Sequence, residues 1–330
     1  MTRLLIISTS QLSEVVHALR LATSLKAQRP DLRISWIVRD IFAPLVRACE
    51  AVDHTYVFRR NEGLGGFMRL MKQVRQTEFD YVFDFQGLLR TGLMTWRAKA
   101  KLKVGRSDAR EGAGIFYNRK VSLPPDGRRS HAMDILLQFC PVLDAKPELQ
   151  GAALQFRPVG GLNLSFLDSR SGAMPVVMFP DSRRKEKKWH GFKQLTEAIA
   201  RDGSGRKVVW AGNAYVDYKD APPENIFLNL TGNTSLVSLP SLIKRACWVI
   251  CNDSGPLHLA AALGVPTLGI FGPTDPRLFG PYPLTAPNNH IVQAPVGNLK
   301  LLTAKDVYAR FQKLDSGRPR TATPFPQRGF

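Results

Sequence analysis

This sequence of 330 residues lacks the signatures of several common protein classes. No stretch approaches the roughly 18 apolar residues that a membrane-spanning helix needs. Met1 leads directly into an apolar run at 4–7 and not into a signal peptide. We therefore expect a protein that stays in the cytoplasm. The four cysteines form no CxxC pair, so neither a zinc site nor a disulfide framework is indicated. We expect all four to be reduced core residues: Cys49, Cys140, Cys247 and Cys251.

Two nucleotide-binding signatures are also missing. The first predicted strand, 4–8, is followed by the loop 9–14 (TSQLSE), which has no glycine where a dinucleotide-binding fold carries GxGxxG. An NAD enzyme is therefore not expected. The chain also has no GxxxxGK[ST] loop, which excludes the P-loop kinases and ATPases.

Acidic residues are few relative to basic ones. The chain has 46 Lys and Arg against 27 Asp and Glu, which gives a net charge of +19. Such a field attracts polyanions such as nucleic acid, anionic lipid headgroups or a phosphorylated glycolipid. The excess is spread over both halves, and each local cluster, including Arg97–Arg106 and Arg183–Lys188, is by itself typical of a solvated surface. Nucleic acid is the weakest of these partners, since no recognition motif accompanies the charge.

The first half alternates short β-rich runs with helical patterns, which is typical of a parallel sheet with helices on both faces. A glycine-rich stretch at 151–172 has no periodic pattern and indicates a linker. We expect a first domain at 1–150. Its predicted strands are 4–8, 34–38, 54–58 and 81–85, and its helices lie at 15–27, from about 42, at 67–76, after 87 and at 132–142.

The same alternation restarts in a second predicted domain at 173–315. Its predicted strands are 176–179, 208–210, 226–230, 248–251 and 267–271, and its helices are 192–200, 215–221, 236–245, 257–263 and 304–314. We expect the last helix to return to the first domain and the tail at 316–330, rich in Pro, Arg, Thr and Gly, to be frayed. Two doubly wound α/β domains that face each other leave a cleft lined by strand carboxyl ends, where ligands usually bind.

The most informative segment is 248–258, where a buried strand stops at a small-residue turn and a helix opens near Pro256. Free backbone N–H groups and the positive end of the helix dipole make such a turn a site for phosphate or pyrophosphate. We expect Asp253, Ser254 and Gly255 to bind there. His258 follows closely and either packs in the core or contacts the ligand.

A second group of polar residues, 179–189, follows the first strand of the second domain. A hydroxyl and several cations there suit two phosphates, because they stabilise the charge that grows on a diphosphate leaving group. Ser182 and Lys187 are the candidates, whereas Arg184 and Lys185 fit an exposed basic loop equally well.

Glu14 stands at the junction between the first loop and its helix. It either complements the helix dipole or acts as a general base over the cleft. His17, one turn later, lies near the apolar side of the helix, and we expect a satisfied, half-buried histidine.

Other candidates follow predicted strands. Asp217 comes after the strand at 208–210, where an acid can hydrogen-bond a ribose diol, although a surface carboxylate fits equally well. Four arginines of the first domain suit the carboxylates and phosphates of an acidic acceptor. These are Arg59, Arg60, Arg90 and Arg110.

From residue 4 to about 314 the chain resembles the ADP-heptose:lipopolysaccharide heptosyltransferases, glycosyltransferase family 9, and is most similar to the heptosyltransferase I type, which adds the first heptose to Kdo of the inner core. The motifs that carry the resemblance are 253–259 (DSGPLHL), 272–276 (GPTDP), 84–88 (DFQGL), 109–111 (ARE), 116–120 (FYNRK) and 187–189 (KKW).

The resemblance implies a GT-B fold of two Rossmann-like domains and an inverting transfer that needs no metal or other cofactor. It implies a nucleotide diphosphate sugar, ADP-heptose, held by the C-terminal domain, and an anionic acceptor such as Kdo-lipid A at the inner face of the inner membrane. The family's proposed base lies in a Gly-Asp-x-x-His segment, which here is Ser13 to His17 with Glu14 at the acid. The family's phosphate-loop lysine matches Lys187, its preceding hydroxyl Ser182, and its donor turn Asp253 to Gly255 with His258. Its basic acceptor side matches Arg59, Arg60 and Arg110.

The sequence departs from the family pattern at two places. Glu14 for Asp lengthens the acidic arm by about 1.5 Å, and Val216 stands where the family has its ribose-binding acid, so that Asp217 is only a neighbour. Two alternatives follow: a glycosyltransferase that uses a GDP- or UDP-linked sugar, and a catalytically impaired glycolipid-binding homologue.

Overall fold

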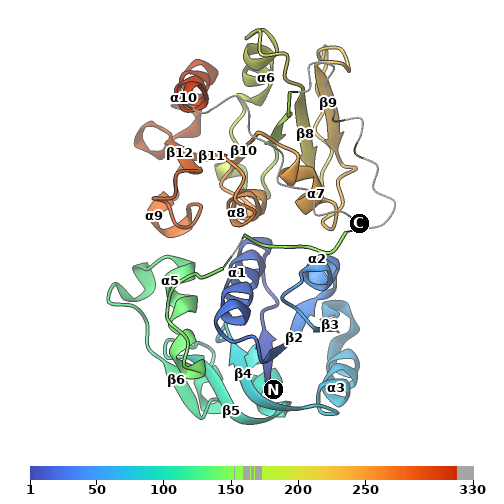
Figure 1. Ribbon diagram of the computed structural model, residues 1–330, viewed down its shortest axis with the longest axis vertical. Coiled ribbons are helices and arrows are strands. Elements are labelled where there is room, and N and C mark those ends of the chain that lie inside the picture. The colour runs from blue at the N-terminus through green and yellow to red at the C-terminus, as the bar shows by residue number, and fades with distance from the viewer. Residues whose placement is uncertain (152, 159–163, 165–166, 168–172, 318–330) are drawn as a thin grey trace.

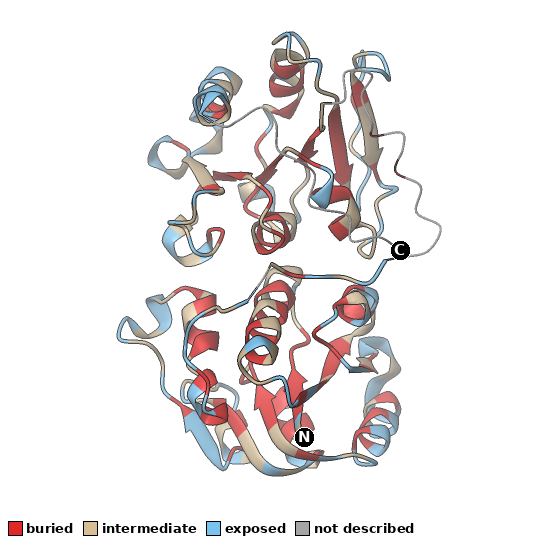
Figure 2. Cartoon of the chain, in the orientation of Figure 1, coloured by how far each residue is buried: buried red, intermediate tan, exposed pale blue. Residues whose placement is uncertain are grey.

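The computed structural model describes residues 1–151, 153–158, 164, 167 and 173–317. It has two α/β domains, each built on a sheet of six parallel strands (Figure 1). Buried residues are concentrated in the central strands of both sheets and on the sides of the helices that cover them (Figure 2). The prediction of two doubly wound parallel-sheet domains is confirmed. Most of the predicted linker and the tail beyond 317 lie outside the described residues.

The first sheet has the strand order β3-β2-β1-β4-β5-β6. Its strands are β1 (Thr2–Ile7), β2 (Leu32–Arg39), β3 (His54–Phe58), β4 (Glu78–Asp84), β5 (Lys99–Arg106) and β6 (Arg119–Val121). One face is covered by α1 (Leu12–Gln28), α2 (Ala43–Ala48) and α5 (Ala132–Leu137). The other is covered by α3 (Gly63–Val74) and α4 (Leu89–Arg97).

The second sheet has the strand order β12-β11-β10-β7-β8-β9. Its strands are β7 (Val176–Phe179), β8 (Val208–Gly212), β9 (Phe227–Thr231), β10 (Trp248–Asn252), β11 (Thr267–Phe271) and β12 (Asn289–Gln293). Helices α6 (Phe192–Ala200) and α10 (Ala304–Ser316) cover one face, and α7 (Leu239–Lys244) and α8 (Gly255–Ala262) the other. A short helix, α9 (Pro276–Phe279), follows β11.

Two predictions about the second domain are wrong. The last helix, α10, packs on α6 of its own domain because Val307 and Phe311 complete the core around Trp248. The segment 215–221 is not a helix. Its backbone is tied to β9, since the N–H of Val216 donates to Thr231 and its carbonyl accepts from the side chain of Asn229, both at 2.9 Å.

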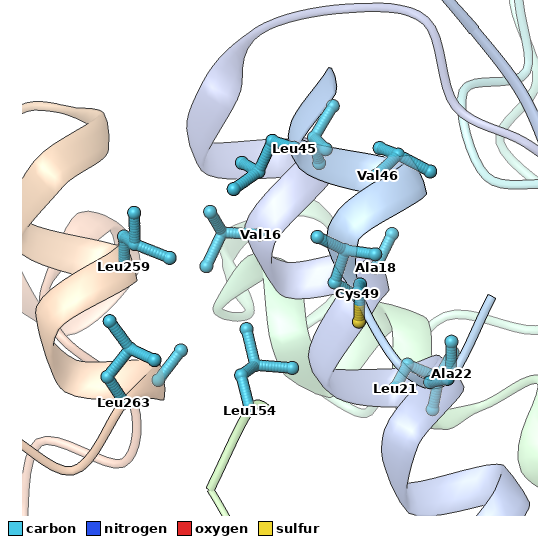
Figure 3. Packing of buried hydrophobic residues seen from close by; sticks show 14 of the residues in the cluster. Val16, Ala18, Leu21, Ala22, Leu45, Val46, Cys49, Leu154, Leu259 and Leu263 are labelled. Carbon is cyan, nitrogen blue, oxygen red and sulfur yellow. The ribbon is translucent and has the colours of Figure 1, made fainter. Parts of the chain in front are cut away.

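A single apolar core runs from one domain into the other. Val16 on α1 lies opposite Leu259 on α8, with Leu154 and Leu263 beside them (Figure 3). The crossing chain is held in this contact, because the N–H of Leu154 donates to the carbonyl of Ala262 at 3.0 Å. Packing of α1 on α8 thus fixes how the two sheets face each other. In the part of the chain that the structure describes, no helix has the length and apolar character needed to cross a bilayer.

Candidate active site between the two sheets

The candidate residues gather at the carboxyl edges of the two sheets. Because each sheet is parallel, the loops that follow its strands emerge at one edge. Leu12 opens α1 after β1, and Gly255 opens α8 after β10. These two residues touch: a Cβ placed on Gly255 would lie 2.6 Å from the side chain of Leu12. The two carboxyl edges therefore face each other.

On the first domain, Glu14 lies in the first turn of α1, two residues beyond Leu12. Its carboxylate accepts hydrogen bonds from the hydroxyl of Ser10 and, at 3.2 Å, from the amide of Gln11. Ser10 in turn accepts from the side-chain amide of Gln86. Glu14 is therefore oriented by a polar network that joins the loops after β1 and β4.

The loop that carries Gln86 is held by a buried carboxylate. Asp84 at the end of β4 accepts hydrogen bonds from the backbone N–H of Gln86 at 2.9 Å, from that of Gly87 at 3.2 Å and from the hydroxyl of Tyr117 at 2.7 Å. Burial raises the pKa of Asp84, and burial together with Asp84 raises the pKa of Tyr117. Sequence reasoning matched this segment to the family but gave no role to Gln86, because the network joins Gln86 to Ser10, 76 residues away in the chain.

On the second domain, Lys187 and Asp253 form an ion pair with an N–O distance of 2.5 Å. The hydroxyl of Thr274 donates to the same carboxylate oxygen at 2.7 Å. The side chains of Lys187 and Asp253 are only 13% and 5% exposed, so the pair is sheltered from water. Lys187, Asp253 and Thr274 follow β7, β10 and β11, so the loops after three strands contribute to this polar group. Thr274 was not predicted as a site residue, although its motif, GPTDP, was recognised.

The turn before α8 holds an unused hydrogen-bonding group. Ser254 is the N-cap residue, but its side chain makes no capping bond. Its Oγ is buried and has no hydrogen-bond partner among the described residues. With the free first-turn N–H groups of the helix, such a hydroxyl can bind an anion. Leu12 covers the adjacent Gly255 from the other domain.

Three histidines meet where the domains touch. His17 of α1 lies 4.7 Å from His258 of α8 and 5.3 Å from His131 before α5, measured between ring centroids. His17 is 4% exposed and its Nδ1 has no partner within the described residues, so the prediction of a half-buried, satisfied histidine is wrong. Burial lowers the pKa of all three rings, that of His258 to about 4 despite the nearby Asp253.

Polar contacts reinforce this junction. The guanidinium of Arg20 donates to the carbonyl of Tyr282, and the hydroxyl of Tyr282 donates to Asp134 at 2.7 Å. Burial lowers the pKa of Arg20 to about 10. The imidazole Nε2 of His131 lies 3.1 Å from the carbonyl of Gly280. These bonds link α1 and α5 to the loops after β11.

The remaining donor-side candidates lie in loops. Ser182 is half-buried after β7. Asp217 is exposed and lies 3.5 Å from the hydroxyl of Tyr215. Neither is brought into the polar group around Lys187 by a hydrogen bond between described residues. Within those same residues, no group of three or more His, Cys, Asp or Glu side chains is arranged to hold a metal ion.

The predicted acceptor-side arginines lie at three strand ends of the first sheet. Arg59 and Arg60 are exposed after β3, with Arg59 3.7 Å from Glu62. The guanidinium of Arg90 lies 5.6 Å from the ring centroid of Phe58. Arg110 is exposed and lines a small polar pocket of about 180 Å³. That pocket is otherwise lined by Gln86, Arg106, Asp108 and Arg128.

Comparison with known proteins agrees with this geometry. The model of glycosyltransferase family 9 (heptosyltransferase) matches residues 67–308. Lipopolysaccharide heptosyltransferase 1 of Escherichia coli K12 is 27% identical over 94% of this chain and all of its own length. The protein of the same name from Pseudomonas aeruginosa PAO1 is 29% identical over 85% of this chain and 81% of its own.

Solved structures share the fold. E. coli heptosyltransferase WaaC with ADP aligns with a TM-score of 0.77 and 24% identity over 95% of this chain and all of its own. A family 9 glycosyltransferase from Veillonella parvula aligns with a TM-score of 0.80 and 17% identity over 96% of this chain and 98% of its own. Since the family model covers most of the sequence, the chain belongs to glycosyltransferase family 9 and is a glycosyltransferase.

Proposed function

We propose that this enzyme transfers a heptose from ADP-heptose to an anionic inner-core lipopolysaccharide acceptor such as Kdo-lipid A. The names of its relatives, lipopolysaccharide heptosyltransferase 1, support the sugar and the pathway, and a similar structure contains ADP. The observation that carries the proposal is the placement of a carboxylate, Glu14, on one strand edge opposite a sheltered cation and a helix N-terminus on the other.

In the proposed reaction, Glu14 accepts the proton of an acceptor hydroxyl as that oxygen attacks the anomeric carbon of the heptose. The attack comes from the face opposite the nucleotide, so the C–O bond to the diphosphate breaks as the new one forms and the configuration inverts. Ser10 and Gln11 hold Glu14 in place for this step.

The diphosphate leaves with its electron pair and needs positive charge. Lys187 supplies this charge, and the hydroxyl of Ser182 and the first-turn N–H groups of α8 donate hydrogen bonds. The reaction as proposed therefore requires no metal and no cofactor. Asp253 keeps Lys187 in position. His258, buried beside them, is a neighbour of the diphosphate, and Asp217 is the candidate for the ribose.

Leu12 must yield when the donor binds, because it lies directly over Gly255. A small change in domain closure or in the Leu12 rotamer opens that turn. On the acceptor side, Arg59, Arg60, Arg90 and Arg110 bind carboxylates and phosphates of the glycolipid. The protein then works at the cytoplasmic side of the inner membrane, bound peripherally.

The test is the variant Glu14→Gln, which keeps the shape of the side chain and removes the base. We expect transfer from ADP-heptose to Kdo-lipid A to fall by about 10² to 10⁴, while ADP still raises the melting temperature. The matched control is Glu224→Gln, since Glu224 is an exposed glutamate of the second domain. A Glu14→Gln enzyme that folds, binds ADP and transfers at the wild-type rate removes Glu14 from this role. A thermal shift with GDP- or UDP-sugars alone reassigns the donor.

A further inference from the structure

Large apolar side chains are exposed on one side of the first domain. The structure exposes eleven such side chains in its described residues, and five of them lie between 64 and 115. We call these five the α3–α4 face: Leu64, Met68, Leu89, Trp96 and Ile115. Leu64 is 77% exposed, Trp96 53% and Ile115 81%. Apolar exposure grouped in this way marks an interaction surface.

The members of this face are neighbours in space. Leu64 and Met68 are four residues apart on α3, whose buried side faces the sheet. The guanidinium of Arg97 bridges the two helices, 3.8 Å from the sulfur of Met68 and 5.1 Å from the ring of Trp96. Phe116, next to Ile115, lies 6.3 Å from Trp96. Helices α3 and α4 and the 3-10 turn η3 (Ala113–Phe116) thus form one surface.

This surface is basic. Neither α3 nor α4 contains an acidic residue, and Lys72 and Arg75 are exposed beyond Met68. Two carboxylates beside the face are engaged, since Glu62 pairs with Arg69 at 2.8 Å and Glu111 accepts from the N–H of Leu89 at 3.1 Å. Glu78, beyond Arg75, is an exposed acid at the far end of α3. Apolar side chains with tryptophan, surrounded by cations, are typical of helices that lie in the headgroup region of an anionic membrane.

We propose that the α3–α4 face docks the enzyme on an anionic phospholipid surface. This inference rests on the proposed function, because both helices start at the carboxyl edge that carries Arg59, Arg60 and Arg90. A membrane against this face brings the headgroup of a lipid-anchored acceptor to the mouth of the site, while the second domain remains free to bind nucleotide from solution.

The test measures co-sedimentation with vesicles of phosphatidylglycerol and phosphatidylethanolamine, and with vesicles of phosphatidylcholine alone. We expect binding to the anionic vesicles only, and binding that weakens as salt increases. Leu64→Ser with Met68→Ser and, separately, Trp96→Ser should each weaken it about tenfold. Lys72→Gln with Arg75→Gln should weaken it roughly fivefold for each charge removed.

Matched controls lie on the second domain. Val296→Ser removes a 94% exposed apolar side chain, and Lys305→Gln with Lys313→Gln removes two exposed charges of α10. Equal losses in the controls and the face variants overturn the proposal, as does equal binding to both kinds of vesicle. If the wild type is a dimer that does not bind vesicles, and Trp96→Ser dissociates it, the α3–α4 face binds a second copy of the chain and the proposal is overturned.

A second readout separates this proposal from the proposed function. With an acceptor fragment that lacks acyl chains, the face variants should transfer heptose at the wild-type rate, because they do not touch the site. Loss of vesicle binding with normal transfer to the fragment supports docking. No transfer by any variant or by the wild type, with vesicle binding intact, overturns the proposed function and leaves the docking surface standing.

Discussion

Two candidate site residues, one from each domain, have opposite surroundings. In the second domain, Lys187 is 13% exposed and is already paired with Asp253. In the first domain, Arg59 is 56% exposed and has only a loose contact with Glu62 at 3.7 Å. The Lys187–Asp253 pair is thus already formed, whereas Arg59 is largely solvated.

This difference distinguishes a cation that is held in position for the proposed reaction from exposed cations that attract an anionic acceptor. A preorganised cation can stabilise charge in the transition state without paying to rearrange. Exposed arginines contribute less each, because water screens them and their side chains lose freedom on binding. Changes in the second domain should therefore affect the rate, and changes to the arginines of the first should affect acceptor binding.

The largest effect is expected for Lys187→Met. Removing one donor from a charge-stabilising site costs about 10² to 10³ in kcat. The change also leaves Asp253 buried without its cation, which destabilises the fold by about 3–5 kcal/mol. Transfer assays and urea unfolding measure the two effects.

A double variant separates the two consequences. Lys187→Met with Asp253→Asn removes both charges, so most of the stability should return while the rate stays low. Recovery of the rate in the double variant contradicts a direct role for Lys187 in the transfer step. It also contradicts the expectation that the second domain controls the rate.

The next effect concerns the core that the domains share. Leu259→Ala on α8 should lower the free energy of unfolding by about 2–5 kcal/mol, because it opens a cavity between α8 and α1. Both domains should still unfold in one transition. Leu301→Ala, at a 52% exposed leucine, is the control and should change stability by less than about 0.5 kcal/mol. Two separate unfolding transitions in the wild type contradict the shared core.

A pH effect follows from the histidines between the domains. Burial lowers the pKa of His258 to about 4 and that of His17 well below its usual value. The unfolded chain, with a histidine pKa of about 6.5, takes up these protons first as the pH falls. The two buried neutral histidines therefore give their full stabilisation above pH about 6.5. As the pH falls toward about 4, the free energy of unfolding should decrease by on the order of a few kcal/mol.

Melting temperatures measured from pH 8 to pH 4.5 check this effect. His17→Gln removes one titrating ring and should flatten the curve, whereas His54→Gln, at an exposed histidine on β3, should not. A wild-type curve that is flat across this range shows that the rings have the same pKa in the folded and the unfolded protein, which contradicts their burial as neutral groups.

The smallest effect is expected for Arg60→Gln. Because Arg60 is exposed, its loss should raise KM for the acceptor about fivefold and leave kcat and the KM of ADP-heptose nearly unchanged. Arg201→Gln on the second domain is the control. A fall in kcat without a change in KM places Arg60 at the reacting atoms. It would contradict the expectation that the first domain's arginines affect acceptor binding and not the rate.

Much of the fold could be predicted from apolar runs and periodicity, and the failures have physical reasons. The strand β5 was treated as a basic cluster, although Ala100, Leu102 and Val104 alternate with lysines in the pattern of a half-buried strand. The segment 215–221 has helical spacing, but side chains of β9 bind its backbone. Tertiary hydrogen bonds of this kind leave no local sequence signal.

The candidate site could be predicted only in part, for a similar reason. Lys187 and Asp253 each follow a strand, so their strand edge was predictable, but their pairing depends on the order β10-β7 in the sheet. Gln86 and Ser10 meet because β4 lies beside β1. The contact of His17 with His258 required knowledge of how the two domains pack, which periodicity does not contain.

The apolar seam between α1 and α8 has a consequence for the timing of catalysis. In the function proposed above, the nucleotide binds at the turn that Leu12 covers, so the seam beside Leu12 has to loosen before spent nucleotide leaves. We therefore expect product departure to depend on how readily this seam loosens. Since apolar association weakens on cooling, we expect nucleotide release to slow less in the cold than the transfer step does.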